Sequence, residues 1–269
     1  YLDEFGKAAG IALNSTFAIC DTADQTALMK KTIEAINLNT SNWPPRSILG
    51  VVSAAKNELM SADEYAKQAM DFNAKTVAKI YAAYEKAMKA ANMADFDDLL
   101  LLTVKLLTGS REVREECRRR WQYLLIDEYQ DTNRAQFKIA SLLAGGAVNE
   151  EGMQMGGPEE TALESSPTRT SLESSATKFA PNICVVGDPD QSIYGWRGAD
   201  ISNILDFEKQ YPTAKVITLG ENFRSTGSIL AAADSLIRNN KLRKHKPLFT
   251  SREAGRKVQV VLCGDEHHE

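Results

Sequence analysis

The sequence predicts an α/β protein in which a parallel sheet follows an all-helical part. Two short apolar runs, Tyr123–Ile126 and Ile183–Val186, have the composition of buried strands, and each is followed by acidic residues or a Gly-Asp step. Apolar residues recur at helical spacing around Gln136–Leu143 and Ile229–Ile237. Buried strands that alternate with helices are typical of a parallel sheet, whose chemistry lies at the carboxyl ends of its strands.

The first part of the chain, to about residue 94, has helical patterns only. Thr22 is a candidate N-cap for a helix that extends to about Asn37. Ser61 and Glu64 form a second capping pattern, and apolar residues then recur every three or four positions as far as Tyr84. This spacing predicts one long amphipathic helix.

Two later apolar runs, Lys215–Leu219 and Val258–Leu262, are predicted to be further strands. Residues 146–181, which precede the run Ile183–Val186, are rich in Ser, Glu, Thr, Gly and Pro, which predicts a disordered surface insertion. Its Ser-Pro and Ser-Ser steps are candidate phosphorylation sites. A tolerated loop without function is the alternative interpretation.

Composition sets limits on the class of protein. The 269 residues are 43% hydrophobic and 25% charged, which is typical of globular proteins. Apolar stretches are only a few residues long, so no membrane span is predicted. The four cysteines are scattered without a Cys-x-x-Cys pair, as in an intracellular protein with reduced thiols. Because the net charge is −4, any contact with DNA must come from local groups rather than from the overall field.

The first candidate site follows the run Tyr123–Ile126, which delivers Asp127 and Glu128 at its end. Nucleotide-hydrolysing sheets hold Mg²⁺ and position a base in this way. Asp127 would ligate the ion, and Glu128 would polarise the attacking water. A bare Asp-Glu pair also occurs as ordinary surface acids after a strand, but the continuation Gln130–Asn133 favours the nucleotide site.

The second candidate site is the segment Gly187–Asp200, which begins with a Gly-Asp turn after a predicted strand. Gln191 is suited to sense a terminal phosphate through a hydrogen bond. Tyr194 and Trp196 offer faces on which unpaired bases stack, regardless of base sequence. Trp196 could instead be a core aromatic, but its flanking glycines and Arg197 favour exposure.

The third candidate site is the segment Leu219–Thr226. Arg224 is a candidate cation for the charge that develops on a transferred phosphoryl group, and Phe223 is suited to stack on an adenine ring. An arginine after a strand is also commonly a solvated surface group, so this motif is weak by itself.

In this order, the three segments resemble the second, third and fourth helicase motifs of the UvrD, PcrA and Rep family of superfamily-one DNA helicases. Asp95–Leu99 matches a further signature of that family, and the likeness reaches into the helical part at Ile48–Gly50 and Ser53–Leu59. The likeness covers nearly the whole chain apart from the insertion.

The resemblance implies a RecA-like P-loop NTPase fold in which two such domains close on ATP. Residues 1–94 would be the inserted helical subdomain called 1B, residues 95–247 part of domain 1A, and residues 248–269 the start of domain 2A. It implies an ATP-dependent helicase that moves 3′-to-5′ along single-stranded DNA, with junctions of single and double strands as substrates, in repair, recombination or replication. A Ser- and Glu-rich insertion favours the nucleus over a bacterial cytoplasm or an organelle.

The resemblance also assigns roles to the candidate residues. Asp127 and Glu128 would serve Mg²⁺ and hydrolysis, while Gln191 and Arg224 would contact the γ-phosphate. Phe223 stands where the family usually has tyrosine and keeps the adenine-stacking face. The residues implied to lie along single-stranded DNA are Phe96, Tyr194, Trp196 and Arg197.

The sequence departs from the family because it lacks several of the family's motifs. No G-x-x-x-x-G-K-(S/T) phosphate loop occurs, and Gly6-Lys7-Ala8 lacks both the spacing and the hydroxyl residue. The arginine-bearing fifth and sixth motifs are also missing, so the chain is expected to be a fragment that does not hydrolyse ATP alone. Two alternatives stay open: an ATPase-silent module that binds single-stranded DNA or docks a partner, and the helicase arm of a helicase-nuclease.

A basic stretch follows the last predicted helix and precedes the presumed domain 2A. Two interpretations of it remain, namely a surface that contacts DNA phosphates and a solvated hinge between domains. Its residues are Arg238, Lys241, Arg243, Lys244, His245 and Lys246.

Overall fold

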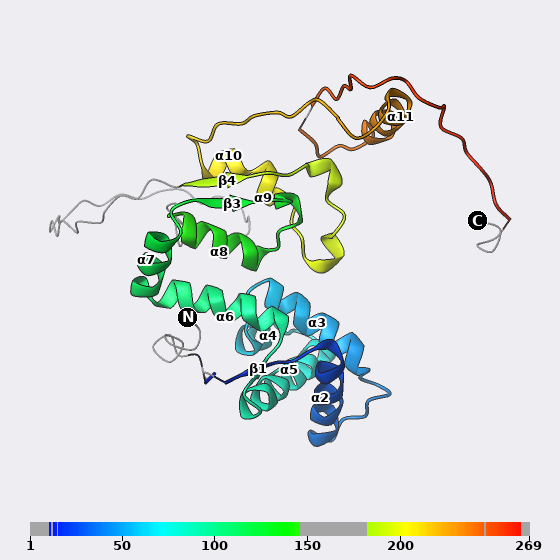
Figure 1. Cartoon of the computed structure of the whole chain (residues 1–269). Coiled ribbons are helices and arrows are strands. Elements are labelled where there is room, and N and C mark those ends of the chain that lie inside the picture. The colour runs from blue at the N-terminus through cyan, green and yellow to red at the C-terminus, as the bar shows by residue number, and fades with distance from the viewer. Residues whose placement is uncertain (1–10, 12, 15, 146–181, 245, 265–269) are drawn as a thin grey trace, which may run out of the picture. The chain divides into compact units, whose positions relative to one another are not determined.

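The computed structural model describes residues 11, 13–14, 16–145, 182–244 and 246–264 (Figure 1). The predicted insertion at 146–181 lies outside the described residues. Within them, no helix combines the length and the apolar character that crossing a bilayer requires. The chain divides into two compact units, which are described separately: unit 1 is Tyr1–Asp127 with Thr132–Val186, and unit 2 is Glu128–Asp131 with Gly187–Glu269.

The first half of unit 1 is built from helices around one apolar core (blue to cyan in Figure 1). Buried side chains from three helices meet there, including Met29, Ile33, Val52, Ile80 and Tyr84. The elements are, in order, β1 (Ala18–Ile19), α2 (Thr22–Ala35), α3 (Pro45–Asn57), α4 (Ala62–Gln68), α5 (Phe72–Ala90) and β2 (Met93–Ala94).

Two features of this half differ from the sequence predictions. The parallel pair β1 and β2 shows that it is not purely helical, with Ala18 in register with Met93. The N-cap of α2 is Asp21 rather than Thr22, because the Asp21 carboxylate accepts from the backbone N–H groups of Ala23 and Asp24.

The predicted single long helix is also wrong, since α4 and α5 are separate. The capping box of Ser61 and Glu64 is confirmed at the start of α4. Helical geometry ends at Ala69, whose ψ is 105°. A new helix begins because the Asp71 side chain accepts a 2.7 Å hydrogen bond from the Ala74 N–H. The apolar stripe continued across this break, so periodicity by itself did not reveal the second N-cap.

The second half of unit 1 contains the predicted α/β arrangement. Strands β3 and β4 pair in parallel, with Leu124 opposite Ile183 and Ile126 opposite Val185, as the sequence predicts. Leu125 and Cys184 are exposed, so the described residues do not bury this two-stranded sheet on both faces. The elements are α6 (Phe96–Gly109), α7 (Arg111–Arg120), β3 (Leu124–Ile126), α8 (Arg134–Ala144) and β4 (Ile183–Val185).

Unit 2 contains a small aromatic group at η1 and α10 and several short helices. Tyr129 is fully buried, and its ring meets Phe207 edge-on with centroids 5.7 Å apart. Phe207 in turn lies 4.7 Å from the ring of Tyr211. The elements are η1 (Tyr129–Asp131), η2 (Pro189–Gln191), η3 (Gly195–Arg197), α9 (Ser202–Leu205), α10 (Phe207–Gln210) and α11 (Gly227–Ile237).

The predicted strands at Lys215–Leu219 and Val258–Leu262 do not form among the described residues. Both segments are irregular, and Ile217 and Leu262 are largely exposed. A strand needs a neighbour for its backbone N–H and C=O groups, and neither segment has one among the described residues, although an isolated parallel bridge joins Glu221 and Phe249 nearby. Apolar character alone did not secure a strand.

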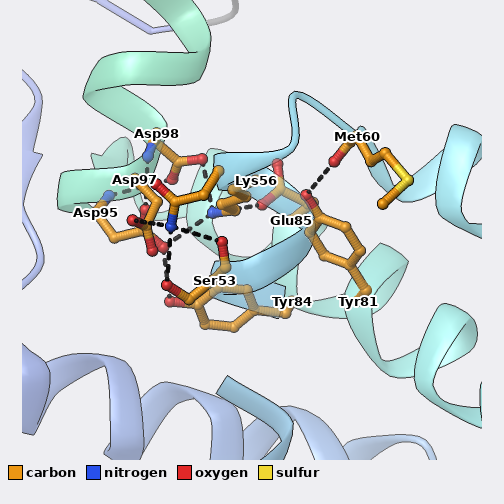
Figure 2. Close-up of polar contacts among 10 residues, drawn as sticks. Ser53, Lys56, Met60, Tyr81, Tyr84, Glu85, Asp95, Asp97 and Asp98 are labelled. Carbon is orange, nitrogen blue, oxygen red and sulfur yellow. Dashed lines mark hydrogen bonds and ion pairs between the residues drawn. The ribbon is translucent and has the colours of Figure 1, made fainter. Parts of the chain in front are cut away.

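A buried lysine ties three helices of unit 1 together (Figure 2). The Lys56 side chain of α3 is 0% exposed, and its Nζ lies 3.0 Å from a carboxylate oxygen of Glu85 in α5. It also lies 2.9 Å from Asp95 and 2.6 Å from Asp98, at the start of α6. The Tyr84 hydroxyl donates to Asp95, and the Tyr84 ring centroid is 5.5 Å from the ammonium. One cation therefore serves three carboxylates.

The electrostatics of this cluster favour a permanently charged lysine. Burial by itself would lower the pKa of Lys56, but Asp98, Asp95 and Glu85 outweigh it and raise that pKa above its ordinary value. Burial raises the pKa of Asp98 to about 7, and the negative charges of Asp95 and Glu85 act in the same direction, while the Lys56 ammonium lowers it. Removal of the ammonium would leave buried carboxylates without compensation.

We predict that Lys56→Met destabilises the chain by about 3 to 5 kcal/mol, since it strands buried carboxylates while keeping most of the side-chain volume. The matched control is Lys79→Met in the exposed face of α5, expected to change stability by less than about 0.5 kcal/mol. Urea unfolding followed by circular dichroism measures both values. Equal stability of the two variants would contradict the prediction.

Candidate functional site

Phe96 is the first residue of α6 and is 61% exposed. The helix start that carries it is fixed by a capping box, in which Asp95 accepts from the Asp98 N–H at 2.7 Å and Asp98 accepts from the Asp95 N–H at 3.1 Å. The same two carboxylates bind Lys56, as Figure 2 shows. The exposed Phe96 ring is therefore attached to a helix start that a capping box and ion pairs hold in place within unit 1.

Asn57 connects the start of α6 to the N-cap of α8. Its side-chain nitrogen donates to Asp97 at 3.1 Å, and its oxygen accepts from the Asn133 side chain at 2.5 Å. Asn133 is also the N-cap of α8, in a capping box with Gln136. The sequence analysis did not single out Asn57. The only signal for it was its place in the family-like stretch Ser53–Leu59.

Glu128 has a left-handed backbone, with φ of 49°. This conformation costs a residue with a side chain about 1 to 2 kcal/mol. Two interactions hold it: the Glu128 carbonyl accepts from the Asp131 N–H at 2.9 Å, and its carboxylate accepts from the Gln130 amide at 2.7 Å. These contacts hold the Glu128 backbone in a conformation that it would otherwise rarely adopt.

Asp127 and Glu128 fit the donor chemistry of a magnesium ion shared with a nucleotide. Both side chains are exposed and offer hard carboxylate oxygens. Within the described residues, no group of three or more His, Cys, Asp or Glu side chains could hold a metal by itself. Mg²⁺ binds through one or two carboxylates plus water and phosphate oxygens, so the pair suffices when a nucleotide supplies the other ligands. The ion would neutralise charge on the phosphates.

The Gly-Asp turn of unit 2 is organised by the Asp188 carboxylate. It accepts from the Asp190 N–H at 3.0 Å and from the Gln191 side-chain amide at 2.8 Å, and it forms an ion pair with Lys246. Burial by itself would raise the pKa of Asp188, but Lys246 and Gln191 outweigh it and lower that pKa. The side chain of Gln191 is thus oriented before any ligand binds.

Part of the basic stretch is bound to this turn. Arg243 pairs with Asp190 at 3.2 Å, and both side chains are mostly buried. Asn240 donates to the other oxygen of Asp190, also at 3.2 Å. Four cations of the stretch are therefore already paired with carboxylates. Arg243 and Lys246 are paired with the turn, Lys244 with Glu208, and Arg238 with Asp234. His245 lies outside the described residues.

Tyr194 and Trp196 form an exposed aromatic pair. Trp196 is 74% exposed, which confirms the predicted exposure, and its ring centroid is 6.4 Å from that of Tyr194. Gly198 follows with φ of 80°, a conformation that glycine adopts without strain. Arg197 ends η3, but its side chain is not among those described. The planes of the two rings are tilted by 48° relative to each other.

Phe223 and Arg224 lie in a loop closed by hydrogen bonds to its own backbone. The Asn222 side chain accepts from the N–H groups of Arg224 and Ser225 at 3.1 and 2.7 Å. The Arg252 guanidinium donates to the carbonyls of Phe223 and Arg224. Both the Phe223 ring and the Arg224 side chain are exposed.

Within unit 2, one hydrogen-bonded path joins two of the predicted site residues. It passes from the Glu128 carboxylate through Gln130 to the backbone of Asp188, whose side chain holds Gln191. Asp127 and Phe96 belong to unit 1. Gln130 was only part of a quoted motif in the sequence analysis, and its part in this path was not foreseen.

We predict that Lys246→Met lowers the free energy of unfolding at pH 7 by about 1 to 3 kcal/mol, because a mostly buried carboxylate loses its ionic partner. Since the pKa of Asp188 is lowered in the folded chain, this stabilisation exists above the ordinary aspartate pKa and disappears as pH falls through the folded value.

Urea unfolding at pH 7 and pH 3 measures this effect. The difference between Lys246→Met and wild type should shrink at the lower pH. The control Lys244→Met removes a more exposed pair with Glu208 and should cost less than about 1 kcal/mol. An equal loss for Lys246→Met at both pH values would contradict the assignment.

Comparison with known proteins places these features in a family. Residues 1–212 match the model of the UvrD/REP helicase N-terminal domain. The chain is 43% identical over 259 residues to the ATP-dependent DNA helicase PcrA of Bacillus subtilis (strain 168), covering 96% of this chain and 31% of that protein. It is 39% identical over 264 residues to the ATP-dependent DNA helicase PcrA of Leuconostoc citreum, covering 98% of this chain and 31% of that protein. The chain thus spans about a third of the length of these curated relatives, and it belongs to the UvrD/REP helicase N-terminal domain family.

Proposed function

We propose that this chain is part of an ATP-dependent DNA helicase that moves 3′-to-5′ along single-stranded DNA. The observation that carries the proposal is a hydrogen-bonded path in unit 2. Glu128 and Gln191, which have the chemistry for ATP hydrolysis, share a hydrogen-bonded path with the turn that precedes the exposed rings of Tyr194 and Trp196. The relatives bear the name of ATP-dependent DNA helicases, which supports the same activity.

The proposed architecture is that of the RecA-like helicases. Residues 1–94 would form the helical subdomain 1B, residues 95–247 part of domain 1A, and residues 248–269 the start of domain 2A. The parallel pairing of β3 with β4 supports an α/β nucleotide domain. The helical core before residue 94 supports a separate helical subdomain.

The proposed nucleotide site binds ATP with Mg²⁺. Asp127 and Glu128 would ligate the ion, and Glu128 would also act as the base that takes a proton from the attacking water. Gln191 and Arg224 would contact the γ-phosphate, and Phe223 would stack on the adenine. The left-handed backbone of Glu128 and the prior orientation of Gln191 support these roles.

The proposed DNA contacts are aromatic and sequence-independent. Phe96, Tyr194 and Trp196 would stack on bases, and Arg197 would contact phosphates. We propose single-stranded DNA and junctions of single and double strands as substrates. An intracellular location goes with this activity. The relatives are bacterial, so they give no support to the nucleus.

A second candidate function rests on the missing phosphate loop. Without its backbone N–H groups and lysine, the 269 residues lack the cradle for the ATP phosphates, while the exposed aromatic pair remains. The chain alone would then bind single-stranded DNA without hydrolysing ATP. ATP turnover by the isolated chain would exclude this alternative.

We predict that Glu128→Gln abolishes DNA-stimulated ATP hydrolysis in the complete protein that contains this chain. The glutamine keeps the shape of the side chain but cannot accept the proton, and loss of a general base lowers the rate roughly 10²- to 10⁴-fold. Steady-state turnover with and without oligo(dT) measures the effect. Binding of ATP and DNA should persist. Full turnover in this variant would rule out the assignment of Glu128.

We predict that Trp196→Ala weakens binding of single-stranded DNA by about 1 to 3 kcal/mol, because one stacking face is lost. Fluorescence anisotropy of a labelled oligo(dT), measured with the complete protein at fixed salt, gives the affinity. The matched control is Trp121→Ala, which removes another exposed tryptophan at the end of α7. An equal loss of affinity in both variants would argue against a specific role for Trp196.

A further inference from the structure

Gln130 is a buried side chain with a full set of partners. It is 1% exposed, and its amide nitrogen donates to Glu128 at 2.7 Å and to Asp131 at 3.2 Å. Its amide oxygen accepts from the Asp188 N–H at 3.0 Å. Its backbone carbonyl also accepts from the Ser192 hydroxyl at 3.3 Å. All of these residues belong to unit 2.

The partners fix the orientation of the amide. Ionised carboxylates only accept hydrogen bonds, so the Gln130 nitrogen must face Glu128. A backbone N–H only donates, so the Gln130 oxygen must face Asp188. Neither glutamate nor methionine can provide both contacts, because ionised glutamate has no donor and the methionine sulfur is only a weak acceptor. Glutamine is thus matched to both sides of the bridge.

Gly187 leaves the space into which this amide fits. A Cβ at position 187 would lie 2.5 Å from the Gln130 Oε1 and 2.8 Å from the Cδ1 of Ile204, closer than such atoms approach. It would also lie 3.1 Å from the backbone nitrogen of Tyr129. The absence of a side chain at Gly187 allows the Gly-Asp turn to approach the Gln130 amide closely enough for a hydrogen bond.

We propose that Gln130 is a positioning residue for hydrolysis, which sets the Glu128 carboxylate relative to the turn that carries Gln191. This inference rests on the proposed function. Glu128 is exposed, and its carboxylate accepts a 2.7 Å hydrogen bond from the Gln130 amide, so Gln130 restricts the direction in which that carboxylate points. Asp188, held on its other side by Gln130, orients the Gln191 amide. This bridge holds the Glu128 carboxylate and the Gln191 amide in one relative geometry. The rate of proton transfer depends steeply on such geometry.

The test uses two variants of the complete protein. Gln130→Met removes both the donor and the strong acceptor at nearly constant volume. Gln130→Glu keeps the acceptor for the Asp188 N–H and loses the donor to Glu128. Gln210→Met, at an exposed position of α10, is the matched control. The readouts are kcat and KM for ATP with saturating oligo(dT), affinity for oligo(dT), and amide hydrogen exchange at Asp188 without nucleotide.

We expect both Gln130 variants to lower kcat about 10- to 100-fold, as loss of a supporting contact does, with KM and DNA affinity unchanged. Exchange at Asp188 should become faster in Gln130→Met and stay slow in Gln130→Glu, since only the former loses the acceptor. Gln210→Met should behave as wild type in all four measurements.

Unchanged kcat in both variants would overturn the inference. So would full activity in Gln130→Glu at a pH high enough to ionise the new carboxyl, because that variant then lacks the donor to Glu128, and so would unchanged exchange at Asp188 in Gln130→Met. These outcomes are distinct from failure of the proposed function, which would show as full turnover in Glu128→Gln. If Glu128→Gln is inactive while both Gln130 variants turn over normally, the helicase assignment stands and the positioning role fails.

Discussion

The buried ammonium of Lys56 is the constraint on which the helical half of unit 1 depends. It joins α3 to Glu85 of α5 and to the first turn of α6, and it is fully shielded from water. Three carboxylates around one cation can be buried only while that cation is present. The start of α6 therefore has little freedom. Phe96 inherits this rigidity, because it follows Asp95 directly.

A neutral group does the corresponding work in unit 2. Gln130 joins Glu128 to the Gly-Asp turn through an amide, which donates on one side and accepts on the other. A buried amide with both partners satisfied avoids the desolvation penalty of a buried charge.

Much of the local structure was predictable from the sequence. The Ser61 capping box, the parallel pairing of the apolar runs before Asp127 and Gly187, and the exposure of Trp196 were all predicted and are confirmed. The single long helix to Tyr84 was wrong because a short-range cap at Asp71 ended an otherwise continuous apolar stripe. The strand at Lys215–Leu219 was wrong because a strand also requires a neighbour, which its own residues do not encode.

By itself, the sequence determined which chemistry is present: the acid pair of Asp127 and Glu128, the Gly-Asp turn before Gln191, and the family to which their order points. These signals are local, since each is carried by residues adjacent in the chain. Only the tertiary structure decided which contacts hold the candidate site residues, both at the start of α6 and at the Gly-Asp turn. Lys56 and Asp95 are separated by 39 positions, and Gln130 and Asp188 by 58. Contacts over such separations follow from how buried polar groups find partners when the chain folds, and no periodicity or motif in one segment records that pairing.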